Sequence, residues 1–228
     1  MSAAPIPTSC EVLVIGAGPA GSACAQLLAR AGIDVLLVDQ QDFPRDKICG
    51  DGLIPDAHAA LQRLGVHAEV MALARRVANA RCVGPRNQHV DVPGTLAVLP
   101  RKQLDDIVCR AARAAGARWL APARFEAPIE VDGRVAGARL KIGDASHVVS
   151  ARWLVLATGA VPQALIAAEM CERHTPSGVA LRGYVQCDAL VGRITELEFK
   201  WHPRLSGGYG WIFPGPGGVF NIGVGLTG

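Results

Sequence analysis

Three glycines, Gly16, Gly18 and Gly21, follow an apolar segment and open a segment with helical periodicity. Residues 11–16 are almost wholly apolar, which is typical of a parallel strand buried on both faces. Apolar side chains then recur at helical spacing from position 20 to position 31, and Gly32 stands where a helix C-cap glycine belongs. Because residues 34–39 predict a second buried strand, the chain is expected to open with a βαβ unit.

This strand–turn–helix context gives the glycine spacing a chemical meaning. The first glycine permits a tight turn, the second lets a pyrophosphate approach the backbone, and the third lets the helix pack closely on the strand. The positive end of the helix then holds the phosphate charge. We therefore predict that a dinucleotide binds at the whole turn, Gly16-Ala17-Gly18-Pro19-Ala20-Gly21.

Asp39 ends the second predicted strand and is placed to accept hydrogen bonds from ribose hydroxyls, and Gln40 follows it. The alternative interpretation is a glycine-rich structural turn with an incidental acid. The order of strand, glycines, helix, strand and acid favours a nucleotide site. The turn alone does not distinguish FAD from NAD, so a plain NAD-dependent dehydrogenase stays an alternative here.

The rest of the chain predicts an α/β fold with a second, β-rich domain. We expect a helix after a charged loop at 40–52, short strands over 77–99, and a helix over 102–115 that ends at Gly116. A hairpin around Asp132-Gly133, a buried strand over 153–157 and an antiparallel sheet from about residue 178 follow. The predicted nucleotide domain comprises 1–76 and 100–165, and the predicted substrate domain comprises 77–99 and 166–228.

Charge and cysteine usage exclude several classes of partner. The formal charge is only +3 and the 23 basic residues are scattered, so no nucleic acid is expected. Seven dispersed cysteines without a CxxC pair, and histidines without an HExxH motif, argue against a metal site and favour a reducing cytoplasm. Gly16, Gly18 and Pro19 interrupt the apolar run over 12–38, which argues against a membrane span. The positive mean hydropathy is compatible with peripheral membrane association. The oligomeric state does not follow from the sequence.

Four further segments resemble the geranylgeranyl reductase family, which has the fold of the flavoprotein hydroxylases. They are Phe43-Pro44-Arg45-x-Lys47-x-Cys49-Gly50-Asp51-Gly52, Pro100-Arg101, Ala157-Thr158-Gly159 and Tyr209-Gly210-Trp211-Ile212-Phe213-Pro214. The resemblance extends from residue 11 over nearly the whole chain. It implies a Rossmann-type FAD-binding domain with an inserted β-rich substrate domain.

The resemblance also implies roles for particular residues. Those expected to contact FAD, beyond the glycine turn, Asp39 and Gln40, are Arg45, Cys49, Gly50, Arg101, Thr158 and Gly159. The resemblance also makes Cys49 a candidate catalytic residue, because a cysteine of this loop lies near the flavin in some members. Tyr209, Trp211 and Phe213 alternate on one strand face and would line the substrate cavity.

Each of these segments has a structural alternative. Arg45 and Lys47 are also readable as a solvated charge pair, Arg101 as a helix cap, and Thr158-Gly159 as an ordinary strand end. Cysteines are most often small buried residues, and aromatics that share a strand face are more often core than cavity lining.

The chain departs from the family pattern in lacking a second Gly-Asp motif that opens a helix. Its Gly-Asp pairs are Gly50-Asp51 and Gly143-Asp144, which lie in other contexts. We therefore expect that a C-terminal part of the flavin site is missing.

The expected activity is FAD-dependent reduction of a carbon–carbon double bond in a hydrophobic, isoprenoid-like substrate. The electron donor, with NAD(P)H as one candidate, does not follow from the sequence. The alternatives are an FAD-dependent monooxygenase or halogenase, and an inactive truncated form or binding module.

Overall fold

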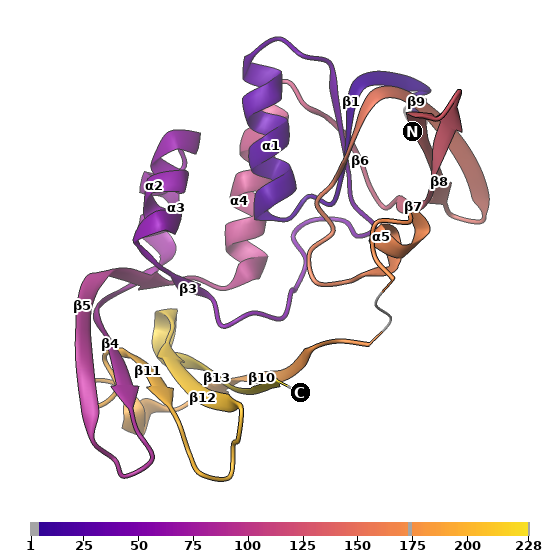
Figure 1. The fold of residues 1–228 in the computed structure, drawn as a ribbon. Coiled ribbons are helices and arrows are strands. Elements are labelled where there is room, and N and C mark those ends of the chain that lie inside the picture. The colour runs from indigo at the N-terminus through magenta and orange to yellow at the C-terminus, as the bar shows by residue number, and fades with distance from the viewer. Residues whose placement is uncertain (1–4, 173–174, 228) are drawn as a thin grey trace. The chain divides into compact units, whose positions relative to one another are not determined.

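The computed structural model describes residues 5–172 and 175–227. These residues form two compact units: the first contains 5–45 and 105–172, and the second contains 46–104 and 175–227. The long helix α4 (Arg101–Ala114) begins in the second unit and continues into the first. Each unit has its own sheet, as Figure 1 shows.

The first unit is built on a six-stranded sheet with the order β6-β2-β1-β9-β8-β7. Its central strand β1 pairs in parallel with β2 on one side and with β9 on the other, and β7, β8 and β9 form an antiparallel meander. The strands are β1 (Ser9–Ile15), β2 (Val35–Val38), β6 (Arg118–Leu120), β7 (Arg124–Val131), β8 (Arg134–Ile142) and β9 (Ala145–Leu156).

Both faces of β1 and β2 are buried, which confirms the prediction from their apolar composition. Val12 and Val14 pack with Val35 and Leu37 on the face covered by α1 (Pro19–Arg30) and α4, where Ala25, Cys109 and Ala112 lie in the same cluster. Leu13 and Ile15 pack on the opposite face, against buried residues of β7, β8 and β9. A short helix, α5 (Gln163–Ala167), follows β9.

The second unit contains a seven-stranded sheet with the order β10-β13-β12-β11-β4-β5-β3. Its strands are β3 (Gly52–Leu53), β4 (Arg75–Val83), β5 (His89–Val98), β10 (Gly178–Gln186), β11 (Leu197–Lys200), β12 (Gly208–Pro214) and β13 (Val219–Thr227). Its helical elements are α2 (Pro55–Leu64), α3 (His67–Leu73), η1 (Asp188–Leu190) and η2 (Pro216–Gly218). All strand pairs are antiparallel except β4 with β11.

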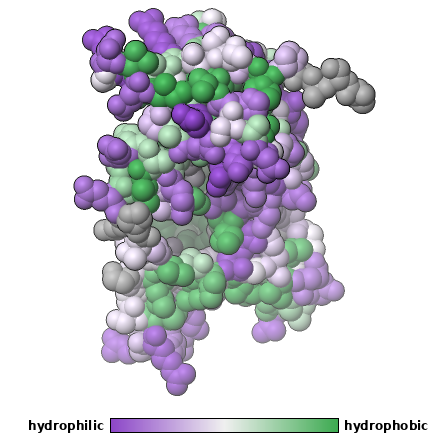
Figure 2. Space-filling view, turned by 90° about the vertical axis from the view of Figure 1, so that its right-hand side faces the viewer, coloured by the Kyte–Doolittle hydropathy of each residue, from purple (hydrophilic) through white to green (hydrophobic). Residues whose placement is uncertain are grey.

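The core of this unit is partly aromatic. Val77, Val98 and Leu197 cluster there with Trp211 and Phe213 of β12. Other apolar side chains are exposed, among them Val179 and Leu181 of the edge strand β10, and apolar surface patches lie between hydrophilic ones in the view of Figure 2.

The α/β class and the β-rich second sheet are confirmed. The sequence missed α3, and it placed the start of β9 at residue 153, whereas the strand begins at Ala145. Residues 46–76 were expected with the nucleotide domain but group with the second compact unit, because β3 pairs with β5 and α2 packs on β5. The functional division of the chain into a nucleotide and a substrate domain stays a prediction.

Candidate functional site

The glycine turn of the first unit is packed so closely that no side chain fits at Gly16 or Gly21. Gly16 has φ +97°, and a Cβ there would lie 2.5 Å from the Ala157 carbonyl oxygen and 3.2 Å from the Thr158 Cα. A Cβ on Gly21 would lie 1.7 Å from the Gly16 carbonyl oxygen. The structure thus brings the predicted turn and the segment Ala157–Thr158 together, at the carboxyl ends of two adjacent parallel strands. Gly159 follows with φ +72° and is exposed.

The first turn of α1 has the properties of an anion site. Gly18 is its N-cap in an extended conformation, Pro19 follows at the first helical position, and no side chain caps this end. The first turn of the helix contains no acidic residue. Ser22 steadies the turn because its buried hydroxyl donates a 2.8 Å hydrogen bond to the Ala17 carbonyl. The amides of this turn and the helix dipole therefore favour a bound phosphate group.

Asp39 is buried and holds the glycine turn in place. Its Oδ2 accepts a 2.8 Å hydrogen bond from the Ala17 amide, and its Oδ1 accepts a 3.0 Å bond from the Gln41 amide. A carboxylate oxygen accepts more than one hydrogen bond, so both oxygens keep capacity for ribose hydroxyls. Gln40, beside it, is exposed. The sequence did not predict the hydrogen bond between Asp39 and the Ala17 amide, and the contact to ribose stays a prediction.

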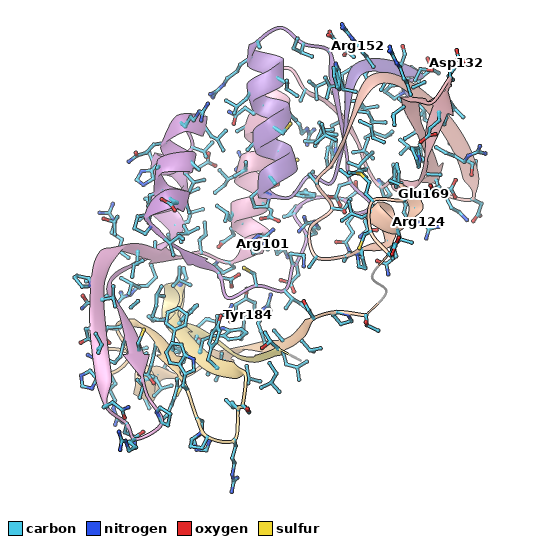
Figure 3. The ribbon with its side chains drawn as sticks, in the orientation of Figure 1. Arg101, Arg124, Asp132, Arg152, Glu169 and Tyr184 are labelled. Atoms are coloured by element: carbon cyan, nitrogen blue, oxygen red, sulfur yellow. The ribbon has the colours of Figure 1, made fainter. Side chains whose placement is uncertain are left out.

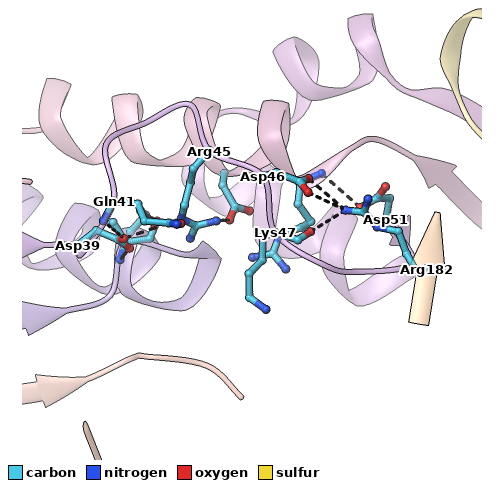
Figure 4. Close-up of polar contacts among 11 residues, drawn as sticks. Asp39, Gln41, Arg45, Asp46, Lys47, Asp51 and Arg182 are labelled. Carbon is cyan, nitrogen blue, oxygen red and sulfur yellow. Dashed lines mark hydrogen bonds and ion pairs between the residues drawn. The ribbon is translucent and has the colours of Figure 1, made fainter. Parts of the chain in front are cut away.

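Arg45 lies near Asp39 in the same unit. Its Nη1 donates a 3.0 Å hydrogen bond to Asp105 Oδ2, and its Nε is 3.9 Å from Asp39 Oδ1. The guanidinium also lies over the Phe43 ring, at 4.5 Å from its centroid. Figure 4 shows Arg45 directed toward Asp39 and Gln41. Arg45 is therefore an ion-paired, mostly buried residue, which argues against a solvated pair with Lys47; its contact with a cofactor stays a prediction.

The second unit brings several other predicted residues together around one carboxylate, that of Asp51. Asp51 Oδ1 accepts a 3.3 Å hydrogen bond from the Arg101 main-chain amide. The carbonyl of Cys49 accepts a 2.8 Å bond from Asn221, and a Cβ on Gly50 would lie 3.1 Å from the Phe213 ring. The loop of residues 46–52 therefore lies against β12 and β13 of its own unit.

Asp51, Tyr184 and Asn221 are residues that sequence reasoning did not select. Asp51 Oδ2 accepts a 2.5 Å hydrogen bond from the Tyr184 hydroxyl and a 2.7 Å bond from Asn221 Nδ2. Burial raises the pKa of Asp51, although these hydrogen bonds and Arg182 oppose the shift. Burial and the bond to Asp51 raise the pKa of Tyr184 as well. Figure 3 shows Tyr184 on β10 and Arg101 at the start of α4. The position of Asp51 between two glycines was the one available sequence signal.

The aromatic residues of β12 share one face, as their alternation predicted. Successive ring centroids are 6.2 Å apart for Tyr209 and Trp211, and 6.4 Å apart for Trp211 and Phe213. Trp211 and Phe213 are, however, buried in the core of the second unit, with 9% and 6% exposure. Tyr209 is 39% exposed and lines a shallow pocket of about 360 Å³ together with Trp201 and His202. The substrate role of the three residues stays a prediction.

Comparison with known proteins places these features in context. A family described as FAD binding domain matches residues 9–180. Menaquinone reductase of Mycolicibacterium smegmatis is 36% identical over 96% of this chain, which covers 55% of that protein. Menaquinone reductase of Mycobacterium tuberculosis is 40% identical over 95% of the chain, again covering 55% of the protein. Digeranylgeranylglycerophospholipid reductase 2 of Methanopyrus kandleri is 31% identical over 96% of the chain and 55% of the protein. The chain thus spans about half the length of the relatives it matches.

Solved structures share the fold at lower identity. A geranylgeranyl bacteriochlorophyll reductase-like protein of Thermoplasma acidophilum aligns with a TM-score of 0.83 and 22% identity, over 96% of this chain and 57% of that one. A flavin-dependent brominase aligns with a TM-score of 0.81 and 23% identity, over 96% of this chain and 56% of that one. At this identity the two likenesses show the fold alone.

Proposed function

This chain belongs to the family of FAD binding domains, and from that premise we propose that it is the cofactor-binding part of a reductase that saturates a carbon–carbon double bond in an isoprenoid-like substrate. FAD is the cofactor, and the reductases among the relatives support an FAD-dependent oxidoreductase. The resemblance to geranylgeranyl reductases is confirmed, since its relatives include digeranylgeranylglycerophospholipid reductases.

The observation that carries the proposal is the close packing of Gly21 on Gly16 and of Gly16 on Ala157. A Cβ at Gly16 or Gly21 would fill this cradle, which lies at a helix start without a side-chain cap, where the pyrophosphate of FAD would bind. Asp39 would hold a ribose of the dinucleotide from the end of β2. We propose further contacts to FAD from Gln40, Arg45, Cys49, Gly50, Arg101, Thr158 and Gly159.

The substrate class is inferred from the names of the relatives. Menaquinone and digeranylgeranylglycerophospholipid both carry isoprenoid chains, which contain carbon–carbon double bonds. Reduced flavin supplies hydride equivalents for such a reduction, while the protein binds, orients and excludes water. Cys49 is proposed to assist the reduction, and Tyr209, Trp211 and Phe213 to contact the substrate. NAD(P)H is the proposed electron donor.

We also propose that the protein works in the cytoplasm and meets its hydrophobic substrate at a membrane surface. All seven cysteines are present as thiols, as in a reducing compartment. In the part of the chain that the structure describes, no helix is long and apolar enough to cross a membrane.

The first experiment is an absorbance spectrum of the purified 228-residue chain before and after addition of FAD. Flavin bands that persist through gel filtration would support the proposal. A chain that stays colourless with excess FAD would overturn the claim that these residues hold the cofactor.

A second experiment tests the reaction. The chain is loaded with FAD, and the flavin is photoreduced in the absence of oxygen. A geranylgeranyl lipid is then added, and the mass of the product is measured by mass spectrometry. A mass gain of two hydrogens for each double bond supports the reductase. In a parallel reaction open to air, oxygen consumption coupled to a hydroxylated or halogenated product would instead indicate a monooxygenase or halogenase on the same fold.

A further inference from the structure

We propose that Asn221 is a positioning residue which, together with Asp51 and Tyr184, fixes the loop of residues 46–52. The inference deepens the proposed function and rests on it in one respect only, namely that this loop contacts FAD. The arrangement of the loop itself is a property of the second unit, to which all of these residues belong.

Both ends of the Asn221 amide are hydrogen-bonded, and the partners fix its orientation. Its Oδ1 accepts a 2.9 Å hydrogen bond from Trp211 Nε1, which is only a donor. Its Nδ2 donates to the Cys49 carbonyl at 2.8 Å and to Asp51 Oδ2 at 2.7 Å, and both of these groups are acceptors. Asn221 is 1% exposed. No other side chain of this size offers one acceptor and two donors in this geometry without a charge.

Asp51 is held in a conformation that non-glycine residues seldom adopt. Its φ is +65°, and it is 2% exposed. Such a conformation is unfavourable for a non-glycine residue and persists only where the surroundings fix it. The hydrogen bonds from Tyr184, Asn221 and the Arg101 amide provide that restraint. The loop is therefore set by its partners and not by its own backbone preference.

Two neighbouring strands of one sheet carry these partners. Tyr184 of β10 lies directly opposite Asn221 of β13 in the antiparallel pair. Arg182, two residues before Tyr184, donates to the Lys47 carbonyl at 3.1 Å and pairs with Asp46 at 3.1 Å. The same strand pair thus holds both the beginning and the end of the loop, and Figure 4 shows the contacts of Arg182 with Asp46 and Lys47.

Few charged or titratable groups face Asp51 in the part of the chain that the structure describes. They are Tyr184 and Arg182 from β10, while α4 contributes the Arg101 main chain and β13 contributes the neutral Asn221. Replacing Asn221 with Asp keeps the shape but sets a second carboxylate against Asp51. Two such carboxylates cannot both be ionised at close range, whereas a single shared proton restores a hydrogen bond.

The test is the variant Asn221→Asp, followed by hydrogen exchange of the Arg101 amide and of the loop amides, each compared with wild type at the same pH. We expect exchange at least about tenfold faster than wild type at pH 8, and within about threefold of wild type at pH 5. FAD titration by fluorescence should show affinity at least about tenfold weaker at pH 8, with recovery at pH 5. The matched control is Asn87→Asp in an exposed turn, which should change neither readout.

If the loop amides of Asn221→Asp exchange hydrogen at the wild-type rate at pH 8, the positioning role is overturned. If the wild-type chain binds no FAD, the proposed function fails. The hydrogen-exchange rates of the loop amides still test the positioning role of Asn221 in that case. If Asn221→Asp does not fold, Tyr184→Phe replaces it: this change removes only the bond to Asp51 and should speed exchange of the Arg101 amide by about threefold. Wild-type exchange in a folded Tyr184→Phe would overturn the inference.

Discussion

Arg45 donates a 3.0 Å hydrogen bond to Asp105, a residue of α4 with no exposed surface. The pair joins the loop after β2 to α4, which with α1 covers one face of the six-stranded sheet. Phe43 lies beneath the guanidinium and packs edge-on against Trp119, with ring centroids 5.6 Å apart. A buried ion pair is thus part of the packing of the first unit.

Removing the acid of this pair should destabilise the protein strongly. Asp105→Ala leaves Arg45 with a buried charge that has lost its nearest partner, and such losses cost about 3 kcal/mol or more. The matched control is Asp106→Ala, which removes an exposed pair with Arg110 on the same helix and should cost under about 0.5 kcal/mol. Urea unfolding of both variants measures the difference, and equal losses would contradict the prediction.

A methyl group at Gly21 should disrupt the dinucleotide turn. Helix propensity alone would make Gly21→Ala stabilising by about 1 kcal/mol. The new Cβ would, however, lie 1.7 Å from the Gly16 carbonyl oxygen, so we expect a net loss of about 2 kcal/mol and no FAD binding. Gly183→Ala, where a Cβ meets nothing within 4 Å, is the control and should retain wild-type FAD affinity. Calorimetry and FAD titration provide the two measurements.

Asp39 should both stabilise the glycine turn and bind the cofactor. Asp39→Ala removes the acceptor of the Ala17 amide and the predicted ribose contact, so FAD affinity should fall at least about tenfold. Asp42→Ala removes a nearby exposed acid and should change affinity by less than about twofold. Fluorescence titration with FAD compares the two, and equal affinities would refute the role of Asp39.

The histidine pair of the second unit should make stability depend on pH. His58 Nδ1 lies 3.0 Å from His67 Nε2, and burial, His67 and Arg76 lower the pKa of His58. The unfolded chain therefore binds a proton more readily than the folded one below about pH 6.5, so stability should fall as the pH drops through that value.

Thermal melts between pH 8 and pH 5 provide the measurement for this pair. His58→Leu should flatten the dependence, because the buried titrating group is gone. If the melting temperature of His58→Leu changes with pH as steeply as that of wild type, other groups cause the pH dependence.

The βαβ unit was predictable because its determinants are local. Strand β1, the glycine turn, α1 and β2 lie within residues 9–38, and each follows from composition or spacing over a few positions. The placement of Asp39 beside the turn follows from the same geometry, since parallel strands end at one edge of the sheet.

The sequence therefore determined the α/β class, the dinucleotide turn and the shared face of Tyr209, Trp211 and Phe213, since these depend on backbone periods of 3.6 and 2 residues. Only the tertiary structure decided which residues pack on that face of β12 and which charged and polar side chains pair with each other. Asn221 and the Cys49 carbonyl are 172 residues apart in sequence, and Arg45 and Asp105 are 60 apart. No local period encodes such pairs, because they form only when sheet order and register bring distant strands and loops into contact.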